Sequence, residues 1–132
     1  MSTRHPLAIN WRNIRLELAG VPEFPQGSAS RAYMLHLPLR QDGTIDEEAF
    51  RENPGIAGFR RFWPNEPDLS GLVVRTGSGW ALLFRRAANG AASVPIELNR
   101  LLPGDEVAIN RYADDSWRYR VVDLSLSPDP QR

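Results

Sequence analysis

The stretch from Leu69 to Arg86, LSGLVVRTGSGWALLFRR, constrains the fold most, because it reads as two strands joined by a tight turn. β-Branched and large apolar residues dominate both halves, as strands prefer. The Gly77-Ser78 pair suits a two-residue type II′ turn, since glycine readily adopts the positive φ that the first central position needs. This turn predicts a register in which Arg75 lies opposite Trp80.

Both faces of this hairpin are largely apolar, so a second turn is needed to decide which face belongs to the core. Asn89-Gly90 is the strongest hairpin signal in the chain. Read as a two-residue turn, it aligns the apolar positions 94, 96 and 98 with one face. The predicted core face then comprises Leu72, Val74, Ala81, Leu83, Val94, Ile96 and Leu98. The opposite face, with Val73, Trp80, Leu82 and Phe84, needs a cover from the chain or from a partner.

Alternation of apolar and polar residues predicts further strands at 13–20, 31–40, 106–112 and 117–124. One face of the strand at 31–40 carries Tyr33, Leu35, Leu37 and Leu39. A three-residue loop at 114–116 places one apolar face on the last two strands, made of Val107, Ile109, Trp117, Tyr119 and Val121. Simple alternation fails at 57–64, where Phe59 and Phe62 are three positions apart. A bulge at Arg60-Arg61 would return both phenylalanines to one side and place the two arginines and Trp63 on the other. A single helical turn is the competing interpretation of this segment.

One short helix is predicted at residues 45–53. Thr44 and Glu47 have capping-box spacing, and acidic residues in the first turn favour the positive end of the helix dipole. Pro54-Gly55 ends the helix after about two turns.

These elements predict a mainly β protein: an antiparallel small barrel or sandwich of about eight short strands with one short helix. The length favours a single domain over residues 1–132. Its core is expected at about 11–124, between a loose N-terminal lead-in and a C-terminal tail. The strand order, and the choice between barrel and sandwich, stay open at this point.

Composition excludes several classes of function. The chain has no cysteine, which rules out disulfides, thiolate metal sites and a cysteine nucleophile. Its formal net charge is zero, which argues against nucleic acid as a partner. No apolar run is long enough to span a membrane, and the N-terminus lacks the apolar segment of a signal peptide. We therefore expect a bacterial-type cytoplasmic protein that does not bind membranes.

No pattern of catalytic or metal-binding residues emerges. His5 and His36 lack a second ligand at useful spacing. The acidic residues cluster at the helix start and in turns, where their types are expected without any catalytic role. The sequence predicts no catalytic residue, no metal site and no cofactor.

Arginine and aromatic side chains are the better indication of a binding surface. All 16 basic residues are arginine, whose planar fork suits stacking and bidentate contacts. Arginine stems that simply cover aromatic rings are the structural alternative. The candidate ligand- or partner-binding residues are Arg60, Arg61, Trp63, Arg75, Trp80, Phe84 and Arg86.

Three functions compete on these residues. The preferred one is a non-enzymatic binding or interaction module that contacts another protein, or a second copy of the chain in a homodimer, through Val73, Trp80, Leu82 and Phe84. The alternative is a small-molecule site for an anionic ligand, with or without catalysis, in a barrel mouth lined by arginines and aromatics. Single-stranded nucleic acid binding uses the same residue types, but the net charge argues against it.

Overall fold

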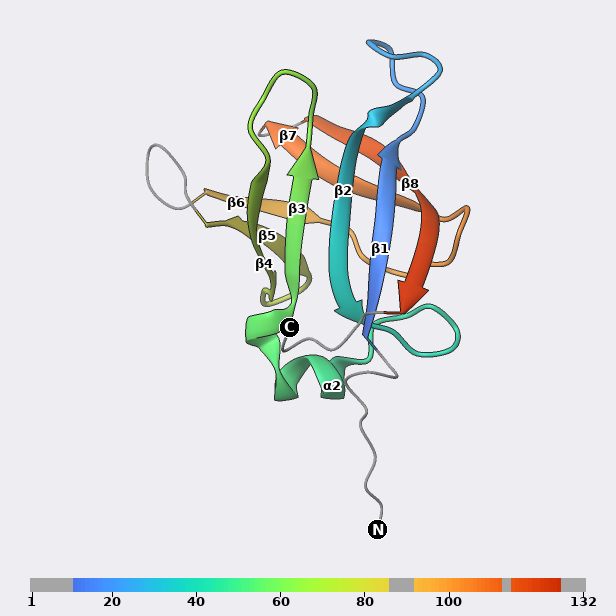
Figure 1. Cartoon of the computed structure of the whole chain (residues 1–132). Coiled ribbons are helices and arrows are strands. Elements are labelled where there is room, and N and C mark those ends of the chain that lie inside the picture. The colour runs from blue at the N-terminus through green and yellow to red at the C-terminus, as the bar shows by residue number, and fades with distance from the viewer. Residues whose placement is uncertain (1–10, 86–91, 113–114, 127–132) are drawn as a thin grey trace.

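The computed structural model describes residues 11–85, 92–112 and 115–126. Eight strands form a closed antiparallel barrel, in which each strand pairs with the next and β8 pairs with β1 (Figure 1). The strands are β1 (Trp11–Leu18), β2 (Ser28–Pro38), β3 (Gly58–Phe62), β4 (Leu69–Arg75), β5 (Trp80–Phe84), β6 (Ala92–Ile96), β7 (Glu106–Tyr112) and β8 (Asp115–Leu126). Helix α2 (Glu47–Glu52) and the 3₁₀ turn η1 (Pro54–Ile56) connect β2 to β3. The predicted mainly β class is confirmed, and the architecture is a barrel.

The alternation seen in the sequence becomes the inward-facing rows of the barrel. Strand β1 buries Ile14, Leu16 and Leu18, and β2 buries alternate residues from Tyr33 to Leu37. At the C-terminal end, β7 and β8 bury the predicted set of Val107, Ile109, Trp117, Tyr119 and Val121. Simple period-two patterns therefore located these strands and their core faces correctly.

The central hairpin has the predicted register but the opposite core face. Arg75 pairs with Trp80, and the Thr76 N–H donates to the Gly79 carbonyl at 2.8 Å. Val73 and Leu82 are nevertheless fully buried inside the barrel. Leu72, Val74 and Leu83 are only half-buried on the outer wall, although Ala81 on that side is buried. The proposed partner-binding face of Val73, Trp80, Leu82 and Phe84 is thus the barrel interior, and that hypothesis loses its basis.

The wrong assignment came from the register between β5 and β6. Ile96 pairs with Trp80, not with Leu83 as the Asn89-Gly90 turn requires. A displacement by an odd number of residues exchanges the two faces of a strand. Ile96 and Leu98 are buried as expected, but they join the other face of the hairpin. The Asn89-Gly90 turn itself lies outside the described residues.

Strand β3 contains no bulge in its pairings with β2 and β4, so the bulge prediction was wrong. Regular alternation places Phe59 and Arg61 on the inner side, whereas Arg60 and Phe62 face outward. An arginine therefore occupies an inward position where the other strands carry apolar residues.

Close contact of β4 with β5 depends on Gly71. A Cβ atom at this position would lie 2.0 Å from the Leu83 carbonyl oxygen, well inside van der Waals contact. Glycine is thus required for the two backbones to approach here.

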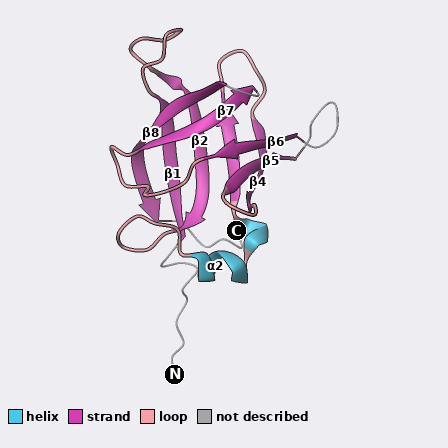
Figure 2. Cartoon of the chain, turned by 180° about the vertical axis from the view of Figure 1, so that it is seen from behind, coloured by secondary structure: helices cyan, strands magenta, loops and turns pink. Residues whose placement is uncertain are grey.

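Helix α2 lies across one end of the barrel (Figure 2). It begins later than predicted, because Asp46 is its N-cap and accepts a hydrogen bond from the Ala49 N–H at 3.1 Å. Ile45 instead forms an isolated bridge with Leu39. Phe50 packs edge-on against Trp80 with ring centroids 5.0 Å apart, which closes this end. Within the residues that the structure describes, no helix covers the opposite end, where β3 joins β4.

Candidate functional site: the aromatic mouth of the barrel

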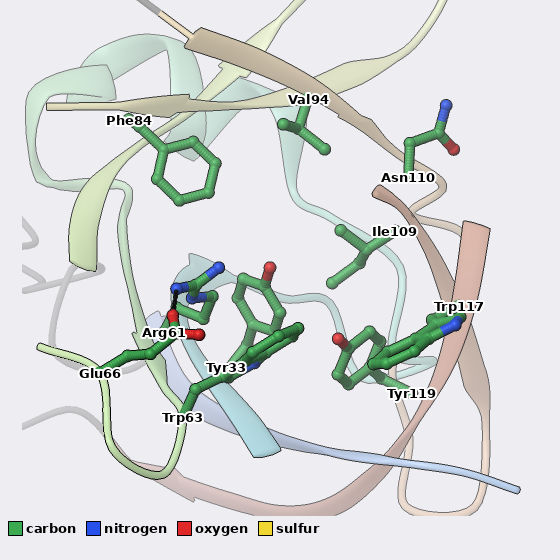
Figure 3. Close-up of a pocket in the computed structure, with 10 residues that line it drawn as sticks. All are labelled: Tyr33, Arg61, Trp63, Glu66, Phe84, Val94, Ile109, Asn110, Trp117 and Tyr119. Carbon is green, nitrogen blue, oxygen red and sulfur yellow. Dashed lines mark hydrogen bonds and ion pairs between the residues drawn. The ribbon is translucent and has the colours of Figure 1, made fainter. Parts of the chain in front are cut away.

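A cavity of about 360 Å³ opens at the end of the barrel opposite α2 (Figure 3). Its lining comes from the ends of strands that meet at this rim and from the loop after β3. The lining residues are Tyr33, Arg61, Trp63, Glu66, Phe84, Val94, Ile109, Asn110, Trp117 and Tyr119. We call this cavity the mouth pocket.

Five of the ten residues that line the mouth pocket are aromatic. The indoles of Trp63 and Trp117 are nearly parallel, with centroids 5.8 Å apart and planes 19° apart. Tyr33 and Tyr119 meet edge to face at 5.1 Å and 88°. Phe84 completes the ring set from β5 (Figure 3). Such a lining suits an apolar, planar molecule, because offset and edge-to-face contacts between rings are favourable.

Arg61 is the positively charged residue that lines the mouth pocket. Its guanidinium lies 4.5 Å from the centre of the Trp63 ring, in cation–π geometry. Its side chain is only 17% exposed, and Nη2 donates to Oε1 of Glu66 at 2.7 Å (Figure 3). Two further donors, Arg61 Nε and Trp63 Nε1, are buried and have no acceptor among the described residues.

Glu66 reaches Arg61 from the solvent side of the rim. It sits in the loop between β3 and β4, next to Asn65, which adopts a left-handed φ of 62°. Asparagine tolerates this conformation better than most residues. The Glu66 side chain is 48% exposed, so its carboxylate stays largely hydrated while it neutralises Arg61. Arg61 and Glu66 are the two charged residues among those that line the pocket, and their charges cancel.

Tyr33 supplies a neutral hydroxyl at the base of the mouth pocket. Burial raises the pKa of Tyr33 to about 12, and the charge and hydrogen bond of Arg61 offset only part of that increase. The hydroxyl therefore keeps its proton at neutral pH. With Arg61 as a donor to its oxygen, Tyr33 can give its own proton to an acceptor in the pocket.

The mouth pocket borders the shortest seam of the barrel, between β6 and β7. Only Ile96 and Ile109 pair along it within the described residues. The Glu97 N–H donates across this seam to Ala108, and backbone groups two residues apart in a strand face the same way. Pro95 thus faces β7 without an N–H to donate, which ends the ladder beside the pocket. Val94 and Asn110 line the cavity on either side of this break.

The structure divides the sequence-predicted site residues among separate places. Arg61, Trp63 and Phe84 come together in the mouth pocket. Arg60 points outward into an open groove on the barrel wall, which Arg85 also lines. Arg86 lies outside the described residues. We expected several arginines to line one pocket, but Arg60 does not line the mouth pocket with Arg61.

Arg75 and Trp80 lie at the closed end of the barrel. They face each other as the predicted register requires, and they form a cation–π contact with the guanidinium 5.0 Å from the ring centre. Arg75 Nε is also 3.4 Å from the Glu47 carboxylate of α2. These contacts attach the helix to the β4–β5 hairpin, which is a structural role.

Sequence reasoning missed more than half of the lining. The missed polar and aromatic residues are Tyr33, Glu66, Asn110, Trp117 and Tyr119. The sequence correctly placed three of these residues on inner faces, namely Tyr33, Trp117 and Tyr119. Their positions along their strands were the one sign in the sequence that they could line a common pocket. Combining them into one site required the strand order, which the sequence left open.

Among the residues that the structure describes, no three histidine or acidic side chains group as metal ligands. His36 instead lies with Nδ1 2.7 Å from the Ile56 carbonyl oxygen. In the same part of the chain, no helix has the length and apolar character to cross a membrane. Comparisons of the chain with protein-family models, with curated proteins and with solved structures found no match.

Proposed function

We propose that this protein is a binding module that holds one small, flat and largely apolar molecule in the mouth pocket. The observation that carries the proposal is the aromatic cavity at one end of a barrel whose other end is closed by α2. Closed eight-stranded barrels have an interior just wide enough for packed side chains or for one small ligand.

The size and lining of the pocket support this choice. Its volume of about 360 Å³ lies at the lower end of the range for small-molecule sites, which begins at roughly 300 Å³. Trp63, Phe84 and Trp117 offer ring surface, while a few polar groups can set the orientation of a ligand. This combination of aromatic rings with a few polar groups is typical of ligand sites.

The polar groups of the pocket favour binding over chemistry. Tyr33 stays protonated at neutral pH because its pKa is about 12, so it acts as a hydrogen-bond donor and not as a base. Arg61 is a permanent cation. Glu66 is the one carboxylate among the lining residues, and it is held by Arg61.

Titration of the full chain with N-phenyl-1-naphthylamine tests the proposal. This uncharged probe, in which a naphthyl group is joined to a phenyl ring through an amine, becomes fluorescent in apolar surroundings. We expect saturable binding at one site per chain. Trp63→Ala and Phe84→Ala should each weaken binding by about tenfold or more, because each removes ring surface from the pocket.

Val122→Ala is the matched control, since Val122 is 40% exposed on β8 and does not line the pocket. It should leave the affinity for the probe unchanged. Uptake that never saturates, or equal affinity in all three variants and the wild type, would contradict the proposal. Circular dichroism spectra of each variant establish that the barrel is intact.

A further inference from the structure

The guanidinium of Arg61 is only partly used within the protein. Nε and Nη2 of an arginine share one edge and can bind both oxygens of a carboxylate. At Arg61, Nη2 donates to Glu66 at 2.7 Å, while Nε is buried without an acceptor in the described part of the chain. Glu66 thus contacts one of the two nitrogens on this edge and leaves the other without an acceptor.

Another arginine in the same barrel shows what the complete contact looks like. Arg100 Nε donates to Asp105 Oδ2 at 2.9 Å, and Arg100 Nη2 donates to Oδ1 at 2.9 Å. Asp105 is fixed in this position because it also accepts from the Leu102 N–H at 2.9 Å. Glu66 has no second hydrogen bond of this kind recorded within the described ranges, and its side chain is 48% exposed.

A second unused donor belongs to the same wall of the mouth pocket. Trp63 Nε1 is buried without an acceptor in the described residues, and the Trp63 ring lies 4.5 Å from the Arg61 guanidinium. Buried donors without partners are rare and costly, so an acceptor-rich group near these two neighbouring lining residues would remove that cost. A carboxylate has two oxygens and about four lone-pair sites.

We propose that the ligand of the mouth pocket carries a carboxylate, which binds the Nε–Nη2 edge of Arg61 in place of Glu66. The inference rests on the proposed function, because it names the ligand class for the same pocket. The exchange replaces one carboxylate by another, so the charge of Arg61 stays neutralised throughout. Glu66 moves to solvent, where half of its side chain already lies. The aromatic part of the ligand then rests among Trp63, Trp117 and Phe84.

Two naphthalene compounds of matched shape, 2-naphthoate and 2-naphthamide, test the inference on the full chain. Isothermal titration calorimetry gives the affinity for each, and displacement of N-phenyl-1-naphthylamine reports binding in the mouth pocket. We expect wild type to bind the carboxylate about tenfold or more tightly than the amide. Glu66→Gln should increase affinity for 2-naphthoate, because it removes the competing carboxylate, and should change affinity for 2-naphthamide less.

Substitutions of the arginines separate geometry from charge. Arg61→Gln should abolish the preference for the carboxylate. Arg61→Lys should lose most of it, because lysine keeps the charge without the two-donor edge. Arg100→Gln, the matched control at the pair remote from the pocket, should leave both affinities unchanged. Melting curves of the variants show that each remains folded.

The outcomes distinguish the ligand class from the pocket itself. Equal affinity of wild type for both compounds would overturn the carboxylate assignment while leaving a small-molecule pocket in place. An unchanged affinity of Glu66→Gln for 2-naphthoate would overturn the exchange with Glu66. If neither compound nor the uncharged probe binds, the proposed function fails together with the inference.

Discussion

The two ends of the barrel are built from the same strands and differ in what they bury. At the closed end, α2 presses Phe50 against Trp80, and the neighbouring Leu101 is fully buried. At the open end, inward positions carry Arg61 and a set of aromatic rings around a cavity. Packed side chains therefore fill one end, whereas the other end leaves a cavity, which is the space that the proposed ligand would occupy.

Strand β5 shows this change from packed core to cavity lining within a few residues. Its inward residues are Trp80 at 8% exposure, Leu82 at 0% and the half-buried Phe84. Trp80 is covered by the helix, Leu82 by the other strands, and Phe84 lines the mouth pocket. Position along the strand, rather than residue type, therefore decides whether an aromatic side chain joins the packed core or lines the cavity.

Truncating one phenylalanine at each end of the barrel tests most directly which end carries the stability. Phe50→Ala should lower the free energy of unfolding by about 3–5 kcal/mol, because it opens a cavity under Trp80. Phe84→Ala should cost less, since Phe84 is half-buried and already borders a cavity. Urea denaturation measures both values. An equal or larger loss for Phe84→Ala would show that the mouth carries as much of the stability as the closed end.

A smaller effect is expected at alkaline pH from Tyr33 at the base of the mouth pocket. Its folded pKa of about 12 exceeds the usual value of about 10, so the unfolded chain loses this proton first as pH rises. Below pH 10, Tyr33 makes its full contribution to the free energy of unfolding. As pH rises from 10 to about 12, the free energy of unfolding falls by a total of roughly 2–3 kcal/mol. Urea denaturation across this range should show a smaller decline in Tyr33→Phe. Parallel declines in variant and wild type would contradict the assignment.

The smallest effect concerns the attachment of α2. Arg75→Gln removes the 3.4 Å ion pair with Glu47 and the 5.0 Å contact with Trp80. Both charged side chains are more than 40% exposed, so solvent screening should limit the loss to about 0.5–1 kcal/mol. The loss should shrink at high salt, and affinity for N-phenyl-1-naphthylamine should stay unchanged. A variant with weakened probe binding would show that the two ends are coupled.

Much of the fold was predictable because strand alternation and tight turns are local. Around Ile14, Leu35 and Val121, the period-two pattern alone predicted which residues face the barrel interior. The Gly77-Ser78 turn fixed the register of the central hairpin. The helix end was clear from Pro54-Gly55, whereas its start was misplaced because Asp46 competes as a cap with Thr44.

The candidate site was predictable only in part. Arg61, Trp63 and Phe84 were identified by residue type, and they do share a pocket. The regular alternation through Arg61 was missed, since an arginine on an inner face contradicts the expectation that inward residues are apolar. The contact between Glu66 and Arg61 could not be predicted from the sequence, because it depends on the geometry of the loop between β3 and β4. The proposal that Glu66 competes with a ligand for Arg61 depends on the same geometry.

Local patterns in the sequence predicted about eight short antiparallel strands and one short helix, because those signals lie within a few neighbouring residues. Which face of the Leu69–Arg86 hairpin turns inward was decided only by the tertiary structure. Both of its faces are apolar, and the choice depends on closing β1 against β8 and on pairing Ile96 with Trp80. Closure of the barrel depends on contacts between strands that are far apart in the chain. It also brings the aromatic rings and Arg61 together at one mouth.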